Sequence, residues 1–136
     1  MGSHDMHRMT KQRDAIRQAL SKAARPLSPH EILKAAGKHV KSLSLATVYR
    51  NLKAMATDDL IHPVQLPGEP PRYELHEAAA HHHHHFHCDS CDKVFDVSGC
   101  PKGLGGLVPS GFTLRAHELV LYGQCSACAK DSGHAA

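Results

Sequence analysis

The stretch HHHHHFHCDSC, residues 81–91, decides how the second half of this chain folds. Its five consecutive histidines look like an affinity tag, but they lie in mid-chain and lead into a Cys-x-x-Cys pair. Together with KVFDV, residues 93–97, the stretch has enough apolar and aromatic character for two strands joined by a turn at 88–92. Successive side chains of a strand point to opposite faces, so odd-numbered and even-numbered histidines would lie on different faces. The run can therefore supply ligands to two metal sites.

Two Cys-x-x-Cys pairs give the strongest metal signal, and their members are Cys88, Cys91, Cys125 and Cys128. Four thiolates from two tight turns form the closed tetrahedral set of a structural zinc. A thioredoxin-like redox pair is the weaker alternative, since neither pair opens a helix in a strand–helix–strand unit. The 33 residues between the pairs exceed the usual zinc-ribbon spacing of about 15–20, so the loop must contain structure. We expect a long strand over 112–124, and a loop or very short helix in the Gly- and Pro-rich segment 98–110.

The composition argues against several classes of protein. The chain has 136 residues, of which 41% are hydrophobic, enough for one ordinary domain or two small ones. No apolar run approaches the roughly 20 residues of a membrane span, and no signal peptide is visible. We therefore expect a cytoplasmic protein with reduced cysteines and no membrane partner. Motifs of metalloproteases, serine hydrolases and phosphate-binding loops are missing, which argues against an enzyme with a small-molecule substrate.

Charge separates the two halves of the chain. Residues 1–76 carry 12 Lys and Arg against 7 Asp and Glu, a net +5. Residues 77–136 carry 4 against 6, a net −2. A basic first half predicts an anionic partner, and a second half rich in Cys and His predicts metal.

Three helices are expected in the first half. Apolar residues recur at helical spacing over 10–24, Ser28 is a good cap for a second helix ending near Gly37, and Ser44 is the expected cap of a third. Residues 1–6, MGSHDM, look like an expression scar and do not enter this prediction.

A hairpin is expected after the helices. Alternating stretches at 60–66 and 72–76 are joined by PGEPP, a rigid turn. Three helices and a hairpin make a winged helix. We therefore predict a winged-helix DNA-binding domain over 7–76, a hinge over 77–80 and a metal-binding domain over 81–130.

The third helix has the composition of a DNA reader. Its buried stripe would consist of Leu45, Val48, Leu52 and Met55. Thr47, Tyr49 and Arg50 would then face outward, where hydroxyl and basic groups can contact phosphates and base edges in the major groove. The alternative is a merely solvated basic face, which is favoured for any single residue but not for the whole order of elements.

Three separated motifs resemble the ferric uptake regulator family. They are LATVYRNL at 45–52, HHHHFHCDSC at 82–91 followed by VFD, and LYGQCSAC at 121–128. The resemblance extends from about residue 9 to 129. It implies an α+β fold, with an N-terminal winged helix and a small α/β dimerisation domain, and a homodimer bound to a double-stranded palindromic operator. It also implies DNA contacts by Arg13, Thr47, Tyr49 and Arg50.

The same resemblance implies three metal sites. The four cysteines would hold the structural zinc. The regulatory site, between the two domains, would consist of His62, His76, His83 and His85. Asp96 could replace one of these ligands. A possible additional site would consist of His82, His84, Cys100 and His117, where Cys100 stands near the family's usual carboxylate.

An all-imidazole regulatory site fits zinc better than iron or manganese, which take harder, six-coordinate sites. The residues around His62 and His76 also resemble the zinc uptake regulators of the family. We therefore expect a metal-dependent repressor that binds operator DNA as a homodimer when a regulatory Zn²⁺ is bound and that controls zinc uptake genes. Two alternatives stay open: an iron- or peroxide-responsive regulator of the same family, and a zinc storage or buffering protein.

Overall fold

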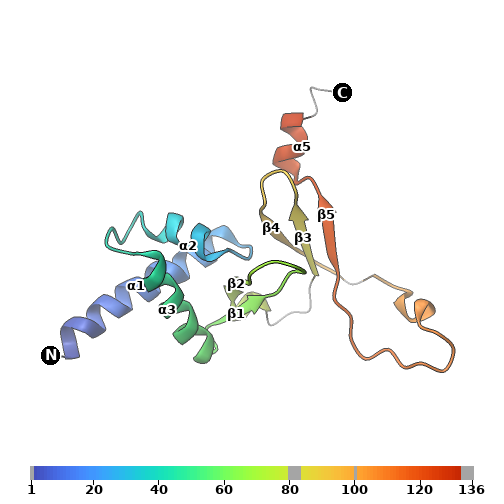
Figure 1. The fold of residues 1–136 in the computed structure, drawn as a ribbon, viewed down its shortest axis with the longest axis horizontal. Coiled ribbons are helices and arrows are strands. Elements are labelled where there is room, and N and C mark those ends of the chain that lie inside the picture. Colours follow the sequence, from blue (N-terminus) through green and yellow to red (C-terminus); the bar gives the residue numbers. More distant parts are fainter. Residues whose placement is uncertain (1, 80–83, 100, 133–136) are drawn as a thin grey trace. The chain divides into compact units, whose positions relative to one another are not determined.

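The computed structural model describes residues 2–79, 84–99 and 101–132, and the chain divides into two compact units between His81 and His82. The fold is α+β, as predicted. The first unit combines three main helices with a two-stranded hairpin, and the second contains a three-stranded sheet and a short helix (Figure 1). Among the described residues, no helix has both the length and the apolar character needed to cross a bilayer.

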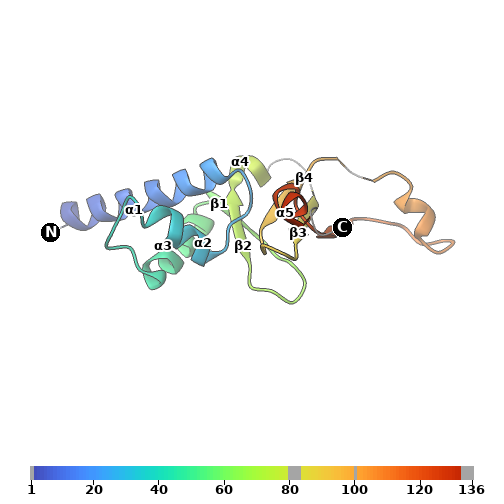
Figure 2. The ribbon, with the colours of Figure 1, turned by 90° about the horizontal axis from the view of Figure 1, so that it is seen from above.

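Three helices build the core of the first unit. They are α1 (Gly2–Ala23), α2 (Pro29–Ala36) and α3 (Leu45–Thr57), with α2 and α3 on the same side of α1 (Figure 2). Their apolar stripes meet in one buried cluster. The predicted start of the first helix, at residue 10, is too late. A helix already packed against a core extends at little cost, so its outer turns need no apolar stripe of their own.

The predicted caps of α2 and α3 are both present. The hydroxyl of Ser28 accepts the amide of Glu31 at 3.2 Å, and the amide of Ser28 donates to the Glu31 carboxylate at 3.1 Å. The hydroxyl of Ser44 accepts the amide of Thr47 at 3.2 Å. These bonds satisfy N–H groups that have no partner within the helix, and so they fix where each helix begins.

The predicted wing is formed by β1 (Ile61–Val64) and β2 (Arg72–Leu75), which pair antiparallel. The turn between them contains Gly68 with φ of 73°, a left-handed conformation that glycine adopts without steric cost. Leu27 and Tyr73 exchange two backbone hydrogen bonds of 2.9 and 2.8 Å. This bridge attaches the wing to the segment between α1 and α2.

A one-turn helix, α4 (His76–Ala79), occupies most of the stretch predicted as a hinge, 77–80. Glu and Ala are strong helix formers, so a segment assigned as a linker from its length and position is helical. The role of 77–80 as a hinge stays a prediction.

The second unit contains a sheet of strand order β4-β3-β5. Its elements are β3 (His84–Cys88), β4 (Val94–Val97), the 3₁₀ turn η1 (Leu104–Leu107), β5 (Val120–Gly123) and α5 (Ser126–Ser132). Strands β3 and β4 form the predicted antiparallel hairpin, and β5 runs parallel to β3. The parallel pairing brings the end of β5 beside the end of β3, where both cysteine pairs begin.

The prediction of a long strand over 112–124 is wrong, because only Val120–Gly123 pairs. Its register places Val120 opposite His85, so the residues before 119 extend past the described start of β3. They therefore have no described strand to pair with. As expected, the described residues of the segment 98–110 form a loop that contains the short turn η1 (Figure 1).

Candidate metal centres and DNA-reading helix

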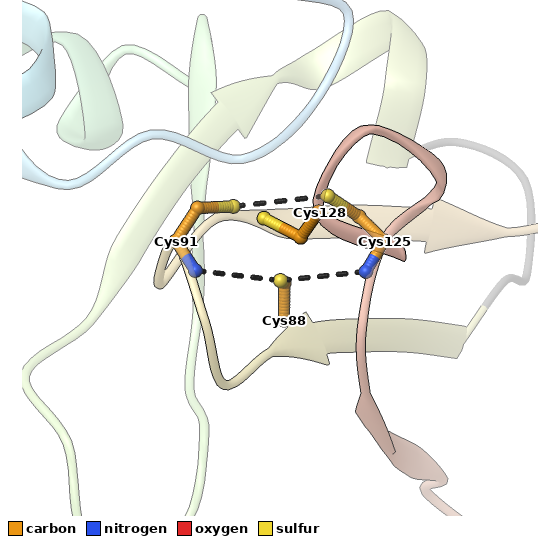
Figure 3. A group of neighbouring side chains, drawn as sticks. All are labelled: Cys88, Cys91, Cys125 and Cys128. Atoms are coloured by element: carbon orange, nitrogen blue, oxygen red, sulfur yellow. Dashed lines mark hydrogen bonds between the residues drawn. The ribbon is translucent and has the colours of Figure 1, made fainter. Parts of the chain in front are cut away.

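Four cysteines meet where β3, its following turn and α5 come together (Figure 3). Cys88 ends β3, Cys91 lies in the turn, Cys125 precedes α5 and Cys128 lies within it. Their four sulfur atoms all lie within 4.8 Å of one another, and the Sγ atoms of Cys91 and Cys125 are 3.8 Å apart. Tetrahedral zinc with Zn–S bonds of about 2.3 Å requires sulfur–sulfur separations of about 3.8 Å. The arrangement therefore fits a structural zinc.

Hydrogen bonds and burial act differently on the individual thiols of this group. The amides of Cys125 and Cys91 each donate to Cys88 Sγ at 3.4 Å, and these bonds lower the pKa of the Cys88 thiol to about 6. The pKa of Cys128 is raised to about 12, first by its hydrogen bond with Cys125 and then by burial. The surroundings therefore favour the thiolate form of Cys88 and the neutral form of Cys128. A divalent ion that prefers sulfur would stabilise all four thiolates.

Two predicted ligands of the regulatory site meet within the first unit. His62 lies on β1, and His76 begins α4 directly after β2. His62 Nε2 and His76 Nδ1 are 2.6 Å apart, and the ring centroids are 4.8 Å apart. The amide of His76 donates to Leu60 at 3.0 Å, which fixes the backbone that carries this ring. Pairing of β1 with β2 is therefore what brings the two imidazoles together.

The other two predicted regulatory ligands belong to the second unit. His83 lies outside the described residues. His85 Nε2 is 3.5 Å from Asp96 Oδ1, because the β3–β4 register pairs these two residues across the hairpin. Asp96, the acidic substitute considered from the sequence, thus lies beside an imidazole of the run, and its role as a ligand stays a prediction.

Two residues of the predicted additional site, His84 and His117, lie among the described residues. His84, which is buried, places its Nε2 3.1 Å from Nε2 of His117, 33 residues later in the chain. His82 and Cys100 lie outside the described residues. His84 and His85 are neighbours on β3 with different partners, as strand alternation predicts.

One contact near the cysteines has no counterpart in the sequence prediction. His87 Nε2 lies 2.7 Å from Asp92 Oδ1, and the His87 ring lies 5.8 Å from that of Tyr122 across the sheet. Asp92 has φ of 66°, a left-handed conformation that Asp tolerates better than most residues. The position of Asp92 directly after the first Cys-x-x-Cys pair was the only sequence feature that could have predicted this contact.

The predicted DNA-reading residues lie on the first turns of α3. Tyr49 and Arg50 are exposed, and Thr47 is half-buried. The Thr47 hydroxyl lies 2.9 Å from that of Ser44 and accepts a hydrogen bond from Arg50 at 3.1 Å. These bonds hold the hydroxyl and guanidinium groups in a defined arrangement at the start of the helix.

The buried face of α3 contains a polar residue that the prediction did not include. Asn51 donates to the Thr47 carbonyl at 2.9 Å and to the Gln12 side chain of α1 at 3.2 Å, and both amides are buried. Arg13, a predicted DNA contact, pairs with Asp58 at the end of α3 at 3.4 Å. Residues of α1 therefore hold α3 at two points.

Comparison with known proteins identifies the family. Residues 5–122 match the Ferric uptake regulator family. The chain belongs to this family. Relatives include the peroxide operon regulator of Bacillus subtilis, 28% identical over 132 residues (93% of this chain, 88% of that protein), and the ferric uptake regulation protein of Synechococcus elongatus, 30% identical over 126 residues (89% and 85%).

Solved structures agree with this assignment. The ferric uptake regulator of Helicobacter pylori, described as having three functional metal binding sites, is 25% identical, with a TM-score of 0.63 over 87% of this chain and 79% of that one. Members of the ferric uptake regulator family are transcriptional regulators, not enzymes. The present chain is accordingly a metal-binding transcription factor that binds DNA.

Proposed function

We propose that this protein is a zinc-dependent repressor that controls zinc uptake genes. The observation that carries the proposal is the His62–His76 pair, with ring nitrogens 2.6 Å apart. Convergent imidazoles suit the nitrogen-rich, tetrahedral coordination of zinc better than the oxygen-rich, six-coordinate sites of iron and manganese.

Three metal sites belong to the proposal. The regulatory ligands would be His62, His76, His83 and His85. The cysteines would hold a structural zinc, and the additional site would consist of His82, His84, Cys100 and His117. A single ion bound by histidines from both units would restrict the orientations that the units can adopt. The conformational entropy cost of binding DNA would then be smaller. By linkage, DNA would tighten metal binding by the same factor.

The proposed DNA contacts are Arg13, Thr47, Tyr49 and Arg50. Exposure of Tyr49 and Arg50 at the start of α3 supports base contacts in the major groove. Arg13, beside the other end of the helix, would contact phosphate.

A second copy of the chain is the proposed protein partner. Apolar side chains are exposed on the second unit at Leu107, Phe112, Leu114, Leu121 and Tyr122. In the described sheet β5 is an edge strand, whose outer edge leaves backbone groups unpaired. A homodimer would cover both features and present two α3 helices to the half-sites of a palindromic operator.

An iron- or peroxide-responsive regulator is the second candidate. The His85–Asp96 contact of 3.5 Å favours it, because a mixed imidazole–carboxylate set suits Fe²⁺ and Mn²⁺. Two relatives, the Bacillus subtilis and Synechococcus elongatus proteins, are named for peroxide and iron responses.

Operator binding under buffered metal decides between these candidates. A duplex would first be selected from a random pool by the zinc-loaded protein, then titrated with metal-stripped protein under buffered Zn²⁺, Fe²⁺, Mn²⁺ or Ni²⁺, with elemental analysis at each endpoint. We expect Zn²⁺ to activate binding beyond one tightly held zinc per chain. Activation by Fe²⁺ or Mn²⁺ while one zinc stays bound would refute zinc sensing, and absence of DNA binding with every metal would favour storage.

His62→Ala, with the exposed His30→Ala as its matched control, tests the ligand assignment. The His62 variant should lose the metal response and keep its tightly held zinc. A normal response in this variant at low zinc would show that the regulatory site lies elsewhere.

A further inference from the structure

Basic charge in the first unit is concentrated in one segment. Between Glu31 and Asp58 the chain contains no acidic residue. Its basic residues there are Lys34, Lys38, Lys41, Arg50 and Lys53. This segment covers most of α2, the connection at 37–44 and all of α3.

Three arginines of the first unit that lie outside this segment have carboxylates nearby. Arg25 lies 2.7 Å from Glu31, and Arg72 lies 3.4 Å from the same carboxylate. Arg13 pairs with Asp58 at 3.4 Å. By contrast, Lys38 and Lys41 are exposed, and neither forms an ion pair with any residue that the structure describes. The connection that leads into α3 therefore carries two positive charges that no carboxylate among the described residues compensates.

Backbone hydrogen bonds hold this connection in place. The amides of His39 and Val40 both donate to the carbonyl of Ala36, at 3.0 and 3.1 Å, and the amide of Leu43 donates to Val40 at 3.1 Å. Leu43 is buried and Val40 packs against the core, so the backbone is anchored from inside. The two lysines thus extend from a fixed support, and little backbone ordering would oppose binding. The connection is the teal loop between α2 and α3 in Figure 1.

We propose that Lys38 and Lys41 bind phosphates of the DNA backbone beside the bases that α3 reads. The inference rests on the proposed function, because these phosphates come within reach only when α3 lies in the major groove. Phosphate contacts set the position of a protein on DNA and carry no sequence information. Each contact releases condensed counterions, so the logarithm of the binding constant falls with the logarithm of salt by about 0.9 per phosphate.

The test compares salt dependence in the full-length, zinc-loaded protein. Lys38→Gln/Lys41→Gln would be compared with Lys22→Gln/Lys102→Gln, which removes the same charge from exposed positions outside the connection. The probes are the selected operator and a random-sequence duplex of about 30 base pairs, whose binding is almost entirely electrostatic. Circular dichroism would check that all variants are folded.

We expect the loop variant to lower the salt slope by about 1.8 on both duplexes, with the control close to the parent. An unchanged slope, or equal reductions in both variants, would overturn the inference. If the slope falls but zinc does not activate operator binding, the zinc proposal fails and the phosphate contacts stand. If the parent binds neither duplex, both fail.

Discussion

Glu31→Gln should weaken the attachment of the wing to the helices. Glu31 accepts from Arg25 at 2.7 Å and lies 3.4 Å from Arg72, which β2 contributes to the wing. Glutamine keeps the shape of the side chain and can still close the capping box with Ser28, but it carries no charge. Buried Arg72 would then keep its longer contact with Glu69, at 3.7 Å.

The magnitude follows from the burial of the two partners. Breaking a buried ion pair on one side costs about 3–5 kcal/mol, and an exposed pair contributes about 0–1 kcal/mol. The Arg72 side chain is 5% exposed and that of Glu31 is 28% exposed, which places this pair between the two cases. We expect a loss of about 2 kcal/mol in unfolding free energy, or roughly 10 °C in the melting temperature of a unit this small.

The pH dependence of unfolding free energy gives an independent test of the Glu31 contacts. Burial alone raises the pKa of Glu31, but hydrogen bonds from Arg25 and Ser28 and the charges of Arg25 and Arg72 outweigh it, so the pKa lies below its ordinary 4.5. A carboxylate with a lowered folded-state pKa stabilises the fold fully above its unfolded pKa. That stabilisation is lost as pH falls through the folded value. The difference between parent and variant should therefore be constant near neutral pH and shrink below about pH 4.5.

Urea denaturation followed by far-UV circular dichroism measures these quantities, because helices dominate the signal. Exposed Glu77→Gln is the matched control, and Arg72→Met completes a double-mutant cycle. We expect the Glu31 and Arg72 changes to be non-additive by at least about 1 kcal/mol. Additive effects, or a Glu31 variant within about 0.5 kcal/mol of the control, would refute the reasoning.

Three further predictions concern other parts of the chain. Asn51→Leu leaves the buried Gln12 amide without its partner and should lower the unfolding free energy, measured by urea denaturation, by about 1–3 kcal/mol. Changing both Asn51 and Gln12 to Leu should cost less than the sum of the two single changes. A double variant whose loss equals that sum would contradict the contact. Gly123→Ala places a methyl group 3.2 Å from the Phe86 ring and should lower the unfolding free energy, measured by thermal melting, by about 1 kcal/mol. The loss caused by the added methyl should be smaller when Phe86 is also changed to Leu. An unchanged loss in that background would show that the strain lies elsewhere. Cys91→Ser removes one of four sulfur ligands, so elemental analysis should find the tightly held zinc lost; retention at the parental level would exclude the cysteine site.

Local signals in the sequence predicted most elements. Ser28 and Ser44 predicted the starts of α2 and α3, because a cap needs only a side chain and the amide three residues later. Alternation around PGEPP predicted the wing in the same way. The prediction of a strand over 112–124 was wrong because a strand depends on a neighbour, and residues 112–118 have no strand to pair with among the described residues.

The sequence by itself determined the order of elements, the two cysteine pairs and the different partners of His84 and His85, because spacing and strand alternation are local properties. Only the tertiary structure brings His62 to His76, His84 to His117 and Asn51 of α3 to Gln12 of α1. The family resemblance had implied the two histidine pairs, whereas nothing in the sequence indicated the Asn51 contact. These residues are separated by 14, 33 and 39 positions. Strand register and helix packing bring such distant groups within hydrogen-bonding distance, and no local pattern specifies which ones will meet.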